Sequence, residues 1–510
     1  MHNSVLYLIV GLIVASAEAG KTAPASVQDV LGRTNVMVLT LAETIGMAVQ
    51  NDLGIAYERS VPGISKAQTM EAKGAFDTTL NASTTVAKNE EPAYGTDGLT
   101  NKTTVTTFNA QAGVAQPLIT GGNLSINYDF VRTGFDPDTS GSYPSYNGSP
   151  QINFTQHLLK SGGLKYSRGP ILIAKNGEEI SVYQFKWRLI ARLVKVQTDY
   201  WALVQAIEAL KVKRDSFKYA MDMLEKNRKQ VKAGLLAEYD VITPEASAAS
   251  LRVDILSTEN VICKYEDTIK NIIFDNNTKL RSDLAIVPAD RPQINEELKE
   301  IMIDLDVTID LALKSRPDYQ QIQLSIKNNE IRKYLAQNQL LPQIDLTAIL
   351  GANTLESSFG GQLNDLTSPD YLDAYVGLTF SLPVENRVAR ARLKIARIQL
   401  EQDLILLKQK ENDIITDVRD AARQLHINFQ QLQANNLNVA AAERLLKAEE
   451  LRFSIGERTS LDVLNAQTSL ANAKLKRSEA LINYNLAIVK LAQQKGTLLE
   501  ENGIEWKITE

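Results

Sequence analysis

The segment KAGLLAEYDVI, residues 232–242, has the same skeleton as SIGERTSLDVL, residues 454–464. Each contains a glycine, five further residues, and then Asp-Val followed by an aliphatic residue. Gly234 and Gly456 are 222 positions apart (456 − 234), and the two aspartates have the same separation. A glycine just past a helix end adopts the left-handed conformation at low cost, and an aspartate caps the free N–H groups of the next helix. Each segment is therefore predicted to be the tip of a helical hairpin.

The residues before each tip repeat apolar side chains at alternating steps of four and three. Such a 3.5-residue period keeps an apolar seam on one side of a helix and favours left-handed supercoiling. The first arm, from about residue 185, would run roughly 70 Å, and the second, from about Arg387 to Ile455, on the order of 100 Å. Helices of this length must pack side by side. The first predicted seam is Leu189, Leu193, Val196, Tyr200, Leu203, Ile207 and Leu210, and the second is Ile415, Val418, Ala422, Leu425, Phe429 and Leu432.

The repeat extends upstream of the hairpins. LTLAETIGMAVQNDLGI, residues 39–55, is similar to VTIDLALKSRPDYQQI, residues 307–322. Two halves are predicted, residues 38–300 and 302–510, each with a helix, strands, a long helix, a tip and a returning helix. The stretch Asn276–Glu296, which contains two prolines, is interpreted as the link between them.

Apolar and polar residues alternate in QINFTQHLL, PQIDLTAIL and AYVGLTFSL, which begin at residues 151, 342 and 374, and more weakly in TTLNASTTV, which begins at residue 78. A strand that crosses a membrane needs about 9–11 residues. One face of a soluble antiparallel sheet gives the same alternation, but the very long helices favour a membrane barrel. A further hairpin is predicted over residues 105–132, with its turn at Gly121-Gly122. The sequence leaves open whether this hairpin joins the barrel.

Four strands cannot close a barrel, because about eight is the smallest number that spans membranes. An open sheet edge in lipid would leave backbone groups unpaired at several kcal/mol each. Several copies must therefore share one barrel: two copies would supply eight strands and three would supply twelve.

Composition excludes several classes of function. The chain has 510 residues and a net charge of −5, which gives no support for nucleic-acid binding. Its single cysteine, Cys263, permits neither an intrachain disulfide nor a cysteine-rich metal site. No catalytic, metal or cofactor site is visible, so we expect no enzyme activity and no cofactor. An apolar run followed by Ala-Glu-Ala predicts a signal peptide over residues 1–19, although no basic residue precedes the run.

The chain resembles the TolC-like outer-membrane efflux proteins over nearly its whole mature length. The resemblance rests on LTLAETIGMAVQND, DLALKSRPDYQQIQ, LLPQIDLTAILG and the paired tips, in that order and with two-fold repetition. It implies an α+β membrane protein: a homotrimer whose twelve-stranded outer-membrane barrel continues into a long α-helical barrel across the periplasm. It also implies a tip that docks a periplasmic adaptor and works with an inner-membrane transporter. In TQHLLKSGG, His157 replaces the proline of the similar family segment.

The resemblance assigns roles to residues at both tips. Asp462 and Asn465 occupy the two positions where the family has acidic side chains at the entrance, and the asparagine departs from that pattern. Arg458 resembles a basic residue that helps to hold the entrance shut, with Asp240 as its expected partner. Simple helix capping is an alternative explanation for both aspartates, and it is compatible with lining a pore. The residues expected to dock the adaptor are Gly234, Leu235, Leu236, Gly456, Glu457 and Arg458.

The leading hypothesis is thus a passive export channel of the outer membrane whose helices extend into the periplasm. A periplasmic adaptor is the alternative, since it also carries a helical hairpin behind a signal peptide, but it would have one hairpin rather than two. A coiled-coil or adhesin-like surface protein would show uninterrupted heptads or a C-terminal barrel. The sequence does not indicate the cargo.

Overall fold

The computed structural model consists of two compact units. Unit 1 comprises Met1–Gly63, Val182–Gln321 and Leu407–Glu510, and unit 2 comprises Ile64–Ser181 and Ile322–Leu406. Each unit takes residues from both predicted halves, so the units do not coincide with the halves, and the two-fold repeat stays a prediction.

The structure describes seven stretches of the chain. The predicted signal peptide lies outside them, as does most of the predicted link between the halves. The described residues are 36–94, 100–135, 144–234, 236–274, 284–290, 302–361 and 371–504.

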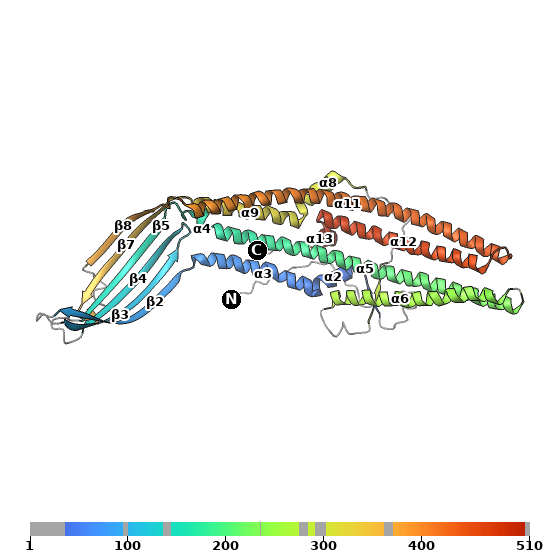
Figure 1. Cartoon of the computed structure of the whole chain (residues 1–510), viewed down its shortest axis with the longest axis horizontal. Helices are drawn as coiled ribbons and strands as arrows, with labels where there is room; N and C mark the ends of the chain where they lie inside the picture. The colour runs from blue at the N-terminus through green and yellow to red at the C-terminus, as the bar shows by residue number, and fades with distance from the viewer. Residues whose placement is uncertain are drawn as a thin grey trace. The chain divides into compact units, whose positions relative to one another are not determined.

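Four long helices form two hairpins, which end at the two predicted tips (Figure 1). The first hairpin consists of α5 (Gly169–Lys232, 64 residues) and α6 (Ile242–Ile273, 32 residues). The second consists of α11 (Arg387–Ser454, 68 residues) and α12 (Ser460–Lys495, 36 residues). At 1.5 Å per residue α11 is about 100 Å long, as the sequence predicts.

The predicted seams form the core of unit 1, with one correction. On α5, Leu193, Tyr200 and Leu203 are fully buried, but the predicted Ile207 is half-buried and Ala206, one residue earlier, is buried. On α11, Ile414 and Ala421 are buried, whereas the predicted Ile415 and Ala422 are only half-buried. The true seam is one residue earlier at these three places, because a helix with 3.6 residues per turn drifts against a strict 3.5-residue repeat.

The predicted link contains a strand that the sequence analysis missed. Strand β6 (Ala285–Pro288) pairs in parallel with β1 (Val36–Leu39), at the start of the described chain. The hydroxyl of Tyr200 donates to Asp290 Oδ2 at 2.7 Å and fixes this small sheet against α5. Burial, together with the hydrogen bond to the Asp290 carboxylate, raises the pKa of Tyr200.

Shorter elements complete the helical part. Thr40 caps α2 through a capping box with Glu43, and Asp304 caps α8. The shorter elements are α2 (Leu41–Asn51), α3 (Leu53–Lys73), η1 (Gly74–Phe76), α4 (Leu164–Ser167), η2 (Glu238–Val241), α8 (Leu305–Ser315), α9 (Pro317–Asn338) and α13 (Leu498–Glu501).

Unit 2 contains one antiparallel sheet of six strands in the order β2-β3-β4-β5-β7-β8. All four segments predicted from alternation are strands, and the hairpin whose place was open supplies β3 and β4. The expected count of four strands per chain is therefore corrected to six. The strands are β2 (Thr79–Tyr94), β3 (Thr100–Pro117), β4 (Gly122–Phe135), β5 (Ser145–His157), β7 (Gln343–Glu356) and β8 (Tyr371–Ser381).

Alternation gives the neighbouring strands β7 and β8 one apolar face. Ile344 pairs with Phe380, Leu346 with Leu378 and Ala348 with Val376. The intervening partners, such as Thr347 with Gly377, lie on the opposite face. Val376, Leu378 and Phe380 are all exposed in the single chain. An exposed apolar face of this kind usually marks a surface that meets another protein or a membrane.

Candidate functional site at the helical tips

The second tip joins α11 to α12 through a turn that depends on glycine. Gly456 has a φ of +83°, a conformation in which a side chain would be strained. Its N–H donates to the Phe453 carbonyl at 3.1 Å, and the Glu457 N–H donates to the Arg452 carbonyl at 2.9 Å. These bonds satisfy carbonyl groups at the helix end that have no partner within the helix.

Asp462 caps the first turn of α12. The Thr459 N–H donates to Asp462 Oδ2 at 3.0 Å, the Thr459 hydroxyl donates to the same oxygen at 2.9 Å, and the Asp462 N–H donates back to the hydroxyl. The two hydrogen bonds from Thr459, with a smaller contribution from the charge of Arg458, hold the pKa of Asp462 below its usual value. The capping interpretation of Asp462 is confirmed, and its position in a pore stays a prediction.

This cap makes the start of α12 sensitive to acid. Because the pKa of Asp462 is lower in the folded than in the unfolded state, its charged form stabilises the fold at pH values above the unfolded pKa of 3.8. This stabilisation is lost as the pH falls through the folded-state pKa. We expect amide exchange in the first turn of α12 to accelerate, relative to the middle of the helix, as the pH drops below about 3.8. Asp462→Asn should abolish this pH dependence in hydrogen-exchange mass spectrometry. The same acid response in the variant would contradict the assignment.

Asn465, the second predicted entrance residue, is exposed on α12. It lies three residues after Asp462, so both side chains lie on the same face of the helix. The structure thus brings these two predicted residues together. It gives this face one carboxylate rather than two, as the sequence indicates.

Arg458 does not pair with Asp240 as predicted. Its Nε lies 3.4 Å from Glu449 Oε2, and Arg452 Nη1 lies 3.3 Å from Glu449 Oε1. Glu449 is a buried residue of α11. The Arg458 side chain therefore points back toward its own hairpin. Asp240 instead stabilises the turn of the first tip, because its Oδ2 accepts a hydrogen bond from the Ala237 N–H at 3.2 Å.

The first tip also has a glycine in the left-handed conformation. Gly234 has a φ of +71°, and its N–H donates to the Val231 carbonyl at 2.9 Å. The buried Asn227 on α5 stabilises the turn, because its Nδ2 donates a hydrogen bond to the Asp240 carbonyl at 2.9 Å. Leu236 is half-buried, and Leu235 lies outside the described residues.

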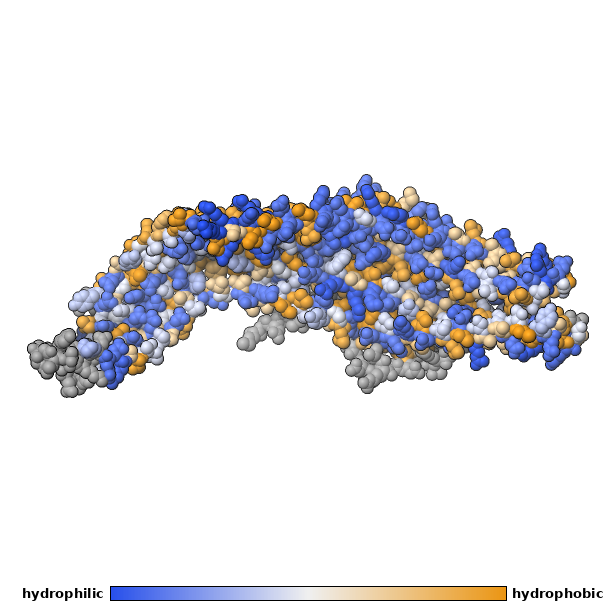
Figure 2. Space-filling model, viewed as in Figure 1, coloured by the Kyte–Doolittle hydropathy of each residue, from blue (hydrophilic) through white to orange (hydrophobic). Residues whose placement is uncertain are grey.

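Exposed apolar side chains surround both tips, and the sequence analysis did not single them out. Tyr239 and Ile242 are 70% and 64% exposed at the first tip, and Ile455 is 64% exposed at the second. Figure 2 shows hydrophobic and hydrophilic residues side by side on the hairpins. For Ile455 the available signal was an apolar residue directly before the turn glycine, where a polar one is usual. Apolar groups kept in water at a helix tip favour contact with a partner.

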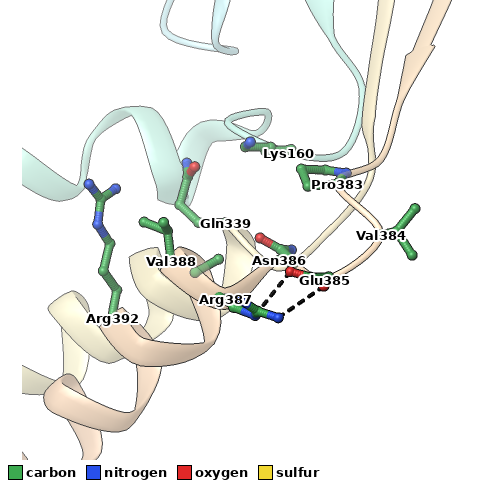
Figure 3. Close-up of a pocket in the computed structure, with 10 residues that line it drawn as sticks. Lys160, Gln339, Pro383, Val384, Glu385, Asn386, Arg387, Val388 and Arg392 are labelled. Atoms are coloured by element: carbon green, nitrogen blue, oxygen red, sulfur yellow. Dashed lines mark hydrogen bonds and ion pairs between the residues drawn. The ribbon is translucent and has the colours of Figure 1, made fainter.

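A pocket of about 520 Å³ lies within unit 2, where β8 leads into α11 (Figure 3). Its lining includes Lys160, Arg387 and Arg392, and Arg387 forms an ion pair with Glu385 at 3.0 Å. Gln339, Asn386 and three apolar residues are also part of the lining, together with Pro383. With Lys160, Arg387 and Arg392 against Glu385, the charged side chains of the lining give the pocket a net positive charge.

The stretches of the chain that the structure describes offer neither a metal cluster nor a membrane-spanning helix. No cluster of three or more His, Cys, Asp or Glu side chains in those stretches could hold a metal ion. Within the same stretches, no helix is both long and apolar enough to cross a membrane.

Comparison with known proteins points to one family. The model of the outer membrane efflux protein family matches residues 308–497, which include α9, β7, β8, α11 and the second tip. The Escherichia coli K12 outer membrane protein TolC is 25% identical over 320 residues, covering 61% of this chain and 62% of TolC. The Vibrio cholerae TolC is 22% identical over 401 residues, covering 78% of this chain and 86% of that protein.

The fold agrees with these matches. The crystal structure of the Campylobacter jejuni CmeC outer membrane channel aligns with a TM-score of 0.65. The alignment covers 99% of this chain and 96% of CmeC at 16% sequence identity. At this identity the likeness establishes the fold: a helical part combined with a β domain.

Proposed function

Because this chain is a relative of the TolC-like outer-membrane efflux proteins, we propose that it is an export channel of the outer membrane. The sheet lies in the membrane, and the helical hairpins extend into the periplasm. The observation that carries the proposal is the six-stranded sheet with one apolar face and two open edges, β2 and β8, in a chain that also has two helical hairpins. In lipid, each unpaired backbone group on an open edge would cost several kcal/mol.

Homotrimerisation removes the open edges. The six strands form a simple up-and-down sequence, so β2 and β8 run in opposite directions. The β8 strand of one copy can therefore pair antiparallel with the β2 strand of the next, and the ring closes without a break in the alternation. The hairpins of the three copies line a common tube. The twelve strands that the resemblance implies correspond to four per chain, whereas this sheet has six.

Export through the channel is passive. An inner-membrane pump supplies the energy, and a periplasmic adaptor connects it to the tips at Gly234, Leu235, Leu236, Gly456, Glu457 and Arg458. The exposed apolar side chains Tyr239 and Ile455, next to these residues, support a docking role. A small apolar patch with a charged rim is typical of protein interfaces.

Asp462 and Arg458 form the entrance gate. Three Asp462 carboxylates on one symmetry axis would attract cations and repel anions, as acidic rings do in other pores. Asp462→Asn is expected to weaken cation selectivity. Arg458→Ser removes the ion pair with Glu449 that fixes the Arg458 side chain at the tip. We expect this variant to conduct more ions in the closed state. Single-channel recording in planar bilayers measures both. Unchanged selectivity and conductance in both variants would contradict the gate.

Membrane fractionation tests the proposed function as a whole. The full chain should be found in the outer membrane, as a trimer that dissociates only on heating before electrophoresis. A peripheral or inner-membrane species would contradict the channel and would indicate the adaptor instead.

A further inference from the structure

The hairpin β3–β4 is built into the middle of the sheet. Sixteen residue pairs join β2 to β3, thirteen join β3 to β4, and twelve join β4 to β5. Strands β2 and β5 are not neighbours, because the hairpin separates them. A hairpin that only decorated or plugged a four-stranded wall would leave β2 and β5 paired with each other.

The two extra strands have the same inside–outside phase as the other four. Two adjacent rows of paired residues, each crossing all six strands, have opposite character. The first row is apolar and exposed throughout: Leu80, Val114, Ile126, Ile152, Leu350 and Ala374. The second consists of polar residues and glycine: Asn81, Gly113, Asn127, Gln151, Gly351 and Asp373.

A lipid-facing wall requires this arrangement, since a slip of one residue would turn every side chain of a strand to the other face. Val114 and Ile126 continue the apolar face that the flanking strands begin. Placed inside a water-filled lumen, the same side chains would remain exposed to water. The register therefore places β3 and β4 in the wall.

The turn of the hairpin is fixed to the segment that leaves β5. The Thr120 carbonyl accepts hydrogen bonds from the Gly163 N–H and from Gln156 Nε2, each at 2.9 Å. Gly121 has a φ of +86°, and a Cβ there would lie 2.6 Å from the Ser161 carbonyl oxygen. The turn and the connection between β5 and α4 thus fit closely against each other.

We propose that each chain contributes all six strands to the membrane wall, so that the trimer closes a barrel of eighteen strands (3 × 6). This inference rests on the proposed function and deepens it. Barrel diameter grows roughly linearly with strand number, so the barrel is about 1.5 times as wide as one of twelve strands. Barrels of 16–18 strands leave an aqueous channel. Polar side chains of the added strands, including Gln111, Asn127 and Asp129, line the exit, which suits bulky hydrophilic cargo.

Site-directed fluorescence quenching tests the placement of the hairpin. Single cysteines are introduced at Val114 and Ile126 on the apolar face, and at Gln111 and Asn127 on the polar face, in a Cys263→Ser background. Each variant is labelled with bimane and reconstituted as a trimer in phosphatidylcholine vesicles with or without brominated lipid. We expect brominated lipid to quench positions 114 and 126 at least threefold more than positions 111 and 127, and iodide to give the reverse order.

A cysteine at Leu378, on the apolar face of β8, separates the two proposals. If bimane at 378 is quenched by lipid and bimane at 114 and 126 is not, the eighteen-stranded wall is wrong and the channel stands. If bimane at 378 is not quenched either, the proposed function itself fails.

Deletion of residues 100–135 provides a second readout. It removes both strands of the hairpin and joins the segment after β2 to the segment before β5. Electron microscopy of the trimer in lipid nanodiscs should show the barrel diameter reduced to about two-thirds of the wild-type value. An unchanged diameter in a folded trimer would overturn the proposal. If the deletion variant does not fold, the quenching comparison decides on the intact chain.

Discussion

Arg316→Met is expected to destabilise unit 1 by about 3 kcal/mol, because it leaves the buried carboxylate of Asp318 without one of its two cationic partners. Arg316 is 2% exposed at the junction of α8 and α9. Its Nη2 lies 2.8 Å from Asp318 Oδ2, and its Nη1 lies 3.0 Å from Asp417 Oδ2 and 2.8 Å from Gln494 Oε1. One guanidinium thus connects α9, α11 and α12, and its planar fork is suited to several acceptors at once.

The carboxylate of Asp318 depends on this arrangement. Burial opposes its charge, but hydrogen bonds from Arg316 and Lys410 prevail and hold its pKa below the usual value. Without Arg316, only Lys410, at 2.8 Å, remains to balance the charge. Burial of a charge with fewer partners is the main source of the expected loss.

Arg188→Met serves as the matched control for this prediction. Arg188 forms an ion pair with Glu58 at 2.8 Å, but its side chain is 64% exposed. An exposed pair contributes about 0–1 kcal/mol. Urea unfolding of the purified protein, followed by circular dichroism of the helices, compares the two variants. Equal losses in both would contradict the importance assigned to burial of Arg316.

The second large effect is expected in the sheet. Leu378→Arg places a charge on the apolar face of β8 and should cost about 2–4 kcal/mol if this face lies near the middle of a bilayer. Thr379→Arg, one position later, places the same charge on the opposite face and should cost much less. Urea titration of folding into phosphatidylcholine vesicles measures the difference. Similar costs for the two variants would contradict a lipid-facing surface at Leu378.

The sequence predicts the helical tips well because each depends on local chemistry. A glycine with positive φ and a capping aspartate are short-range requirements: Gly234 and Gly456 have the expected backbone conformation, and Asp462 forms the expected cap. The seams are also predictable, since burial follows a simple period. The exceptions are Ile207, Ile415 and Ala422, where the drift of a long helix moves the buried position one residue earlier.

Long-range pairing could not be predicted from alternation alone. The segments that form β3 and β4 would alternate in the same way as an isolated hairpin or as part of the wall, and only the register distinguishes them. The partner of Arg458 was missed for a related reason. The resemblance suggested a contact from Arg458 to the other tip, but Glu449 on the same hairpin is closer along the chain and lies within reach.

The buried arginine was also missed. Arg316 lies in RPDY, a segment quoted for its resemblance to a family rather than for its chemistry. Arginine is rarely fully buried, so its burial was not the expectation from residue type. The acidic partner Asp417 is about a hundred residues away in the chain, and no local pattern connects the two.

Disulfide formation between β8 of one copy and β2 of the next tests the shared wall most directly. In a Cys263→Ser background, Asn81→Cys on the first strand is combined in turn with Gly377→Cys, Thr379→Cys and Ser381→Cys on the last, all on the polar face. Oxidation in native outer membranes should link at least one combination into dimers and trimers on non-reducing gels, with no larger species, while each single cysteine gives at most a dimer. If every combination remains monomeric while the protein is folded in the membrane, the strands of separate copies do not close a common barrel.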